Sequence, residues 1–69
     1  MHFAKTIEMS AESEQGFHDA VQRGCERAAK TLENVQSIWV KNEEIVMNNG
    51  KVQAFRVHLK VTFQLNDES

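Results

Sequence analysis

The chain has 69 residues, of which 41% are hydrophobic and 26% are charged, and its formal net charge is −2. These values are typical of one small globular domain, which we assign to residues 1–69. The chain has no run of about 18 apolar residues, which disfavours a membrane span, and its mild acidity disfavours nucleic acid as a partner. Residues 1–5 lack the basic stretch and apolar core of an export signal. Together with the lone Cys25, this predicts a reducing, cytoplasmic location.

Small size is the main physical constraint on this fold. A domain of about 60 residues buries only about 60% of the surface of its unfolded chain, so a monomer is marginally stable. One cysteine cannot form an internal disulfide, and no Cys/His cluster has the spacing of a zinc site. We therefore expect copies of the chain to cover apolar surface that one copy leaves open.

The first two predicted elements are a strand and a helix. Residues 3–9 alternate between apolar and polar, which predicts a half-buried strand. Ser13 is the predicted N-cap of a helix that ends near Asn34, because Glu14 follows it in the first turn. The apolar stripe of this helix recurs at steps of three and four residues: Phe17, Ala20, Val21, Gly24, Ala28, Leu32 and Val35. Gly24 in this stripe predicts that another element approaches the helix closely.

The second half of the chain predicts a hairpin. Residues 35–47 form the predicted second strand, whose polar middle at 41–44 indicates a bulge or an exposed edge. Asn49-Gly50 favours a tight turn, and residues 55–65 alternate without a fault, so one face of the last strand is buried. Residues 66–69 form a polar tail, predicted to be loose. The fold class is therefore α+β, with β-α-β-β order and a three-stranded antiparallel sheet wrapped around one amphipathic helix.

Residues with catalytic or metal-binding chemistry do not form a known motif. His2, His18 and His58 lack the spacing of a zinc site. The acidic pairs at 43–44 and 67–68 do not form a calcium-binding loop, although copies in an oligomer would bring more carboxylates together. Cys25 has no activating base nearby in the sequence, and the three glycines are isolated. We expect the protein not to be an enzyme.

Two side chains have both a structural and a ligand-binding interpretation. Trp39, the single tryptophan, either fills an interface or forms a stacking platform for a planar ligand. Arg56 either orients an anionic group of that ligand or pairs across the sheet with a carboxylate such as Glu43 or Glu44.

Three segments, taken in order, resemble a known family. They are the predicted helix at 13–34, with its run 26–35, the turn at 49–52, and the terminal strand at 55–65. Their order, spacing and total length are similar to those of the dodecins, small proteins that assemble into hollow dodecamers and in many members bind flavins. The resemblance covers essentially the whole chain and implies a homododecamer.

The resemblance also assigns four candidate ligand positions. Flavin-binding dodecins carry a tryptophan shortly after the helix, and Ser37 occupies that position here. Trp39 lies on the same strand face, displaced by about 6–7 Å along the strand. Arg56 stands at the position of a flavin-contacting glutamine, and Gln64 at that of a basic residue of phosphate-binding members. These substitutions predict that flavin binding is altered or lost.

The function that the resemblance implies is ligand storage rather than catalysis. The dodecamer would bind, store or buffer a small ligand between subunits, with FMN, riboflavin or FAD as candidate cofactors. In this hypothesis Trp39 stacks on the ligand, Arg56 orients it and Ser37 leaves room. The alternative is a structural or calcium-binding shell without an organic ligand, as in relatives that lack the tryptophan.

Overall fold

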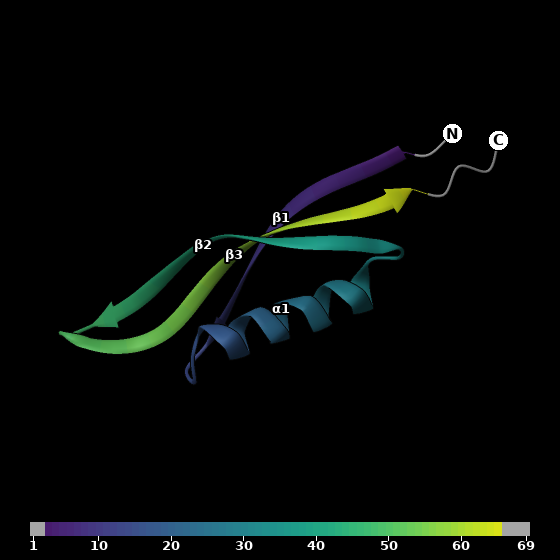
Figure 1. The fold of residues 1–69 in the computed structure, drawn as a ribbon. Helices are drawn as coiled ribbons and strands as arrows, with labels where there is room; N and C mark the ends of the chain where they lie inside the picture. Colours follow the sequence, from purple (N-terminus) through teal and green to yellow (C-terminus); the bar gives the residue numbers. More distant parts are fainter. Residues whose placement is uncertain (1–2, 66–69) are drawn as a thin grey trace.

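The computed structural model describes residues 3–65, which form one sheet and one helix. The elements are β1 (Phe3–Ser13), α1 (Phe17–Thr31), β2 (Val35–Asn48) and β3 (Lys51–Leu65). The antiparallel sheet has the strand order β1-β3-β2, and α1 lies along one face of it (Figure 1). This is the predicted β-α-β-β order. The predicted tail at 66–69 and His2 lie outside the described residues.

The core lies between α1 and the middle of β3. Val57, Leu59 and Val61 alternate along β3 and are at most 1% exposed. α1 contributes only small buried residues to this contact, namely Ala20, Gly24 and Ala28. A Cβ on Gly24 would lie 2.5 Å from Cδ1 of Leu59, so the glycine permits the close approach that the sequence predicts. Within residues 3–65 no helix has the length and hydropathy that a membrane crossing requires.

The predicted boundary between the first strand and the helix is wrong. β1 continues to Ser13 instead of ending at residue 9, and α1 begins at Phe17 after Gly16 as N-cap. Pairing with β3 extends the strand, because Glu12 lies opposite Arg56 and Ser13 lies opposite Phe55. The Ser13 hydroxyl therefore caps no helix.

That hydroxyl instead stabilises the turn into α1. It accepts a hydrogen bond from the Gln15 amide at 2.9 Å and donates one to Asp19 Oδ2 at 2.5 Å. The other end of the helix also differs from the prediction, since α1 stops at Thr31 rather than near Asn34. Leu32 already has an extended backbone, with φ −119° and ψ 144°, so the helix does not continue past Thr31.

The hairpin is confirmed, and its strands are longer than predicted. β3 begins at Lys51 rather than at 55, and the turn contains Asn49 and Gly50, both with positive φ. β2 is an edge strand, and one of its register shifts lies between Val40 and Asn42, within the polar segment that predicted a bulge. Further register shifts lie between residues 35 and 37 and between residues 46 and 47.

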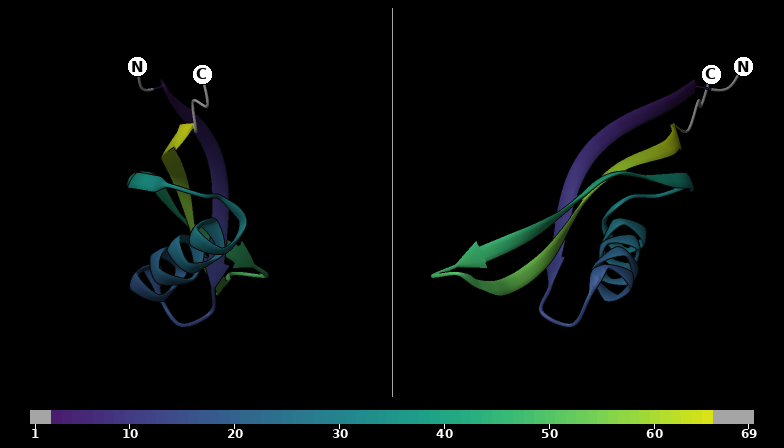
Figure 2. Two further views of the ribbon diagram at one scale, coloured as in Figure 1. Left: turned by 90° about the vertical axis from the view of Figure 1, so that its right-hand side faces the viewer. Right: turned by 60° about the vertical axis from the view of Figure 1, so that its left-hand side comes forward.

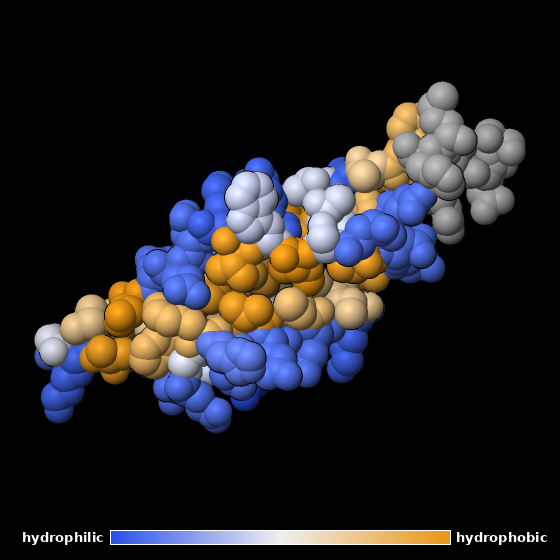
Figure 3. All heavy atoms as spheres, in the orientation of Figure 1, coloured by the Kyte–Doolittle hydropathy of each residue, from blue (hydrophilic) through white to orange (hydrophobic). Residues whose placement is uncertain are grey.

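The subunit is long and thin. Its principal extents are 55 × 17 × 14 Å, and its radius of gyration is 14.4 Å, whereas a compact domain of this length has about 11 Å. The β2–β3 hairpin projects beyond α1 at one end, and the paired ends of β1 and β3 project at the other (Figure 2). Apolar surface continues along the hairpin arm (Figure 3). Large apolar side chains of the two arms are 43–54% exposed: Phe3, Ile45, Met47, Val52 and Leu65.

Candidate functional site

The candidate site is the sheet face opposite α1, which we call the open face. Along β3 the buried residues 57, 59 and 61 point toward the helix, so the residues between them point to the open face. Side chains directly opposite one another on neighbouring strands share a face. The open face therefore carries Glu8 and Glu12 of β1, Ser37, Trp39 and Glu44 of β2, and Arg56, His58, Lys60 and Thr62 of β3.

Trp39 lies in the middle of the open face. It is 67% exposed, more than any other large hydrophobic residue described. Lys60 is its cross-strand partner on β3, and the Lys60 Nζ lies 5.6 Å from the centre of the indole ring. Ser37 lies opposite Thr62 on the same face, so the prediction that Ser37 and Trp39 share a face is confirmed.

Arg56 lies between two carboxylates. Its Nε is 2.8 Å and its Nη2 is 2.5 Å from Oε1 of Glu12, and its Nη1 is 3.2 Å from Oε1 of Glu44. The hydrogen bonds to Glu12 and then Glu44 raise the pKa of Arg56. Cross-strand pairing with a carboxylate, one of the two interpretations that the sequence left open, is therefore present in the subunit.

Glu44 joins this cluster to a histidine. His58 Nε2 lies 2.6 Å from Oε1 of Glu44. The hydrogen bond from His58 lowers the pKa of Glu44, and the hydrogen bond from Arg56 adds to the effect. Sequence reasoning missed this contact, because it depends on the bulge in β2 that aligns Glu44 with Arg56.

The four predicted site residues share the sheet but do not meet in one subunit. Along β3, Arg56 lies four residues before Lys60 and Gln64 lies four residues after it. Each is therefore about 13 Å from Lys60 along the strand. Ser37 and Trp39 lie near the middle of this span. The backbone N–H of Gln64 donates a hydrogen bond to the backbone carbonyl of Asn34 at 3.0 Å.

The carboxylates of the open face all have cationic partners. Lys41 Nζ lies 3.4 Å from Glu8, and Arg56 engages both Glu12 and Glu44. Within residues 3–65 no group of three or more His, Cys, Asp or Glu side chains has the geometry to hold a metal ion. The described part of one subunit therefore presents a tryptophan within a balanced set of charges.

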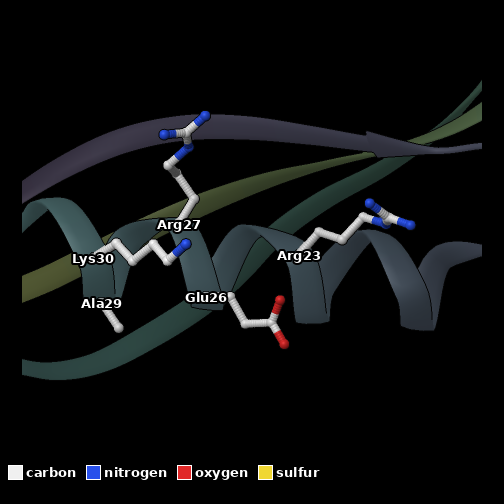
Figure 4. Close-up of a pocket in the computed structure, with 5 residues that line it drawn as sticks. All are labelled: Arg23, Glu26, Arg27, Ala29 and Lys30. Carbon is white, nitrogen blue, oxygen red and sulfur yellow. The ribbon is translucent and has the colours of Figure 1, made fainter.

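A second surface feature is a shallow hollow on α1, on the side away from the sheet. Its lining includes Arg23, Glu26, Arg27 and Lys30. The side chains of Glu26 and Arg27 point in opposite directions and do not converge on a common point (Figure 4). Arg23 is already bound to Asp19 at 2.7 Å. This hollow is therefore a weaker candidate than the open face.

Comparisons with known proteins agree with this architecture. The Dodecin family model matches residues 3–66. The dodecin from Streptomyces davaonensis is 27% identical, with a TM-score of 0.87 and coverage of 96% of this chain and 97% of its own. A mutant of the T. thermophilus dodecin is 30% identical, with a TM-score of 0.87 and coverage of 97% and 100%. The comparison with curated proteins finds no match.

A more distant solved structure shares the fold. The calcium dodecin from Mycobacterium tuberculosis is 19% identical, with a TM-score of 0.82 and coverage of 97% of this chain and 96% of its own. The family match spans nearly all of the sequence, and the strand order and single helix agree with it. The chain belongs to the dodecin family.

Proposed function

We propose that the protein assembles into a hollow homododecamer that binds and stores a small ligand between subunits and is not an enzyme. Family membership supports this proposal, and so does the shape of the subunit. The radius of gyration is 14.4 Å, about 3 Å above that of a compact domain of this length. Burying the apolar arms against other copies would supply the stability that the small core does not. We place this assembly in the cytoplasm.

The proposed ligand is a planar aromatic molecule of the flavin type, such as riboflavin, FMN or FAD. The observation that carries this proposal is Trp39, whose side chain is 67% exposed on the open face. A large exposed indole offers a stacking surface for another aromatic ring. Trp39 would stack on the ligand and Ser37 would leave room for it. Arg56 and Gln64 would reach the same ligand only from neighbouring subunits.

Fluorescence titration tests this function directly. Trp39 is the single tryptophan, so its emission reports on this site alone. We expect riboflavin and FMN to quench Trp39 emission, and the protein to quench flavin emission, at micromolar protein. Trp39→Phe should retain part of the flavin quenching and Trp39→Ala should lose it, with the light-scattering mass unchanged. Absence of quenching in the unmodified protein would remove flavins from this account.

The alternative is a structural or calcium-binding shell without an organic ligand. Arg56 favours it, because Glu12 and Glu44 already occupy the guanidinium that would orient a ligand. In this case Trp39 would seal an interface, and carboxylates from neighbouring copies would collect cations. A colourless protein whose melting temperature rises in millimolar calcium, but not in magnesium, would favour this alternative over flavin storage.

A further inference from the structure

Among residues 3–65, the open face includes a cation, Lys60, that forms no ion pair with a carboxylate. Arg56 is bound to Glu12 and Glu44, and both carboxylate oxygens of Glu8 lie 3.4 Å from Lys41 Nζ. Among residues 3–65, Lys60 forms no such ion pair, although Glu8 lies opposite it in the sheet. The carboxylate of Glu8 is instead held by Lys41, so within the described part of the chain no carboxylate pairs with the Lys60 ammonium.

Lys60 places a positive charge directly beside Trp39. Trp39 and Lys60 are cross-strand partners, and Lys41 and Glu8 form an ion pair on the same face. The cation beside the exposed indole is thus Lys60, whereas the ammonium of Lys41 is engaged by Glu8. The Lys60 ammonium rests on the indole at 5.6 Å. A cation–π contact at an exposed site is weak, so the flexible lysine can exchange it for an anion at little cost.

We propose that the Trp39 site selects planar ligands that carry an anionic group, and that Lys60 is the residue that binds this group. The inference rests on the proposed function, since Trp39 has to stack on the ring. A ring on the indole would displace the ammonium, whose three N–H donors would then bind a phosphate or carboxylate attached to that ring. Phosphate is the stronger partner because it carries more negative charge.

A comparison of riboflavin with FMN isolates the effect of the anionic group, because the two ligands share the isoalloxazine ring and differ by one phosphate. We expect FMN to bind the unmodified protein about tenfold more tightly than riboflavin at low salt, a difference of about 1.4 kcal/mol. Salt should reduce this preference by screening. Lys60→Gln should bring the ratio close to one by weakening FMN alone, and Lys60→Arg should retain the preference.

Lys30→Gln is the matched control for Lys60→Gln, because it removes the same charge from the outer side of α1. It should leave the FMN preference intact. Equal affinities for FMN and riboflavin in the unmodified protein would overturn the inference and leave flavin storage standing. An FMN preference that survives Lys60→Gln would also overturn it. Failure of both ligands to bind would overturn the proposed function itself, and the inference with it.

Discussion

Gly24 shows how one residue sets the distance between the helix and the sheet. A Cβ at this position would lie 2.5 Å from Leu59 Cδ1 and 3.2 Å from the Ala11 Cβ. Leu59 is 1% exposed, so its side chain would have to shift within the core to admit this atom. The glycine lowers helix propensity by about 1 kcal/mol relative to alanine, and close packing against β1 and β3 offsets that loss.

Gly24→Ala should therefore destabilise the protein although alanine is the better helix former. The overpacking cost of about 1–3 kcal/mol exceeds the propensity gain. The measurement is the denaturation midpoint at a fixed protein concentration. Leu59→Ala removes the atoms that clash, so the double variant should be more stable than the sum of the two single effects predicts. A midpoint equal to or above that of the unmodified protein would contradict the packing argument.

The same scale shows what local sequence could and could not predict. The position of Gly24 in an apolar helical stripe was sufficient to predict a close approach. Ser13 was misassigned, because its capping preference is local while its actual role depends on a strand in the second half of the chain. Ser13 pairs with Phe55, and its hydroxyl binds Asp19 rather than a helix amide.

At the scale of elements, β3 organises the molecule and was the most predictable part. Its strict alternation assigns one face to the core and the other to the open face, and it pairs with both other strands. The prediction that Ser37 and Trp39 share a face followed from the alternation of side chains along a strand, which repeats every two residues. That Lys60 lies beside Trp39 did not follow, because register shifts at residues 35–37 and 40–42 decide which residues of β2 and β3 are opposite.

A cluster of charged side chains spans the three strands, and it predicts that the stability of the fold depends on pH. We call it the charged ladder, and its members are Glu12, Arg56, Glu44 and His58. Glu44 has a pKa below its ordinary value of 4.5, first because of the hydrogen bond from His58. A carboxylate with a lowered folded-state pKa adds stability above its unfolded pKa, and this stability is lost as the pH falls through the folded value. The melting temperature should therefore fall between about pH 5 and pH 3, and less steeply in Glu44→Gln.

Glu33→Gln provides the comparison for this pH series, because Glu33 is exposed and lies outside the ladder. Its profile should follow that of the unmodified protein. Parallel profiles for the unmodified protein and Glu44→Gln would show that the contacts of Glu44 with His58 and Arg56 add nothing to acid stability. Exposed ion pairs are individually weak, so high salt should flatten the difference between the two profiles.

At the scale of the whole molecule, a single copy of the chain leaves large apolar side chains exposed. Most of the buried hydrophobic residues among the described residues lie where α1 meets the middle of β3, while the two arms extend past this contact and give a principal extent of 55 Å. Ile45, Met47 and Val52 lie on the hairpin arm and are about half exposed. An apolar arm of this kind is unstable in water without a partner.

Stability should consequently depend on protein concentration. Association that occurs only between folded subunits raises the melting temperature by mass action, so a hundredfold dilution should lower it. Met47→Glu places a charge on the apolar arm and should reduce both the light-scattering mass and the melting temperature. Gln53→Glu adds the same carboxylate at an exposed polar position of the same arm and should change neither. A monomeric mass with a melting temperature that is independent of concentration would contradict assembly, because the arms would then be stable in water as they are.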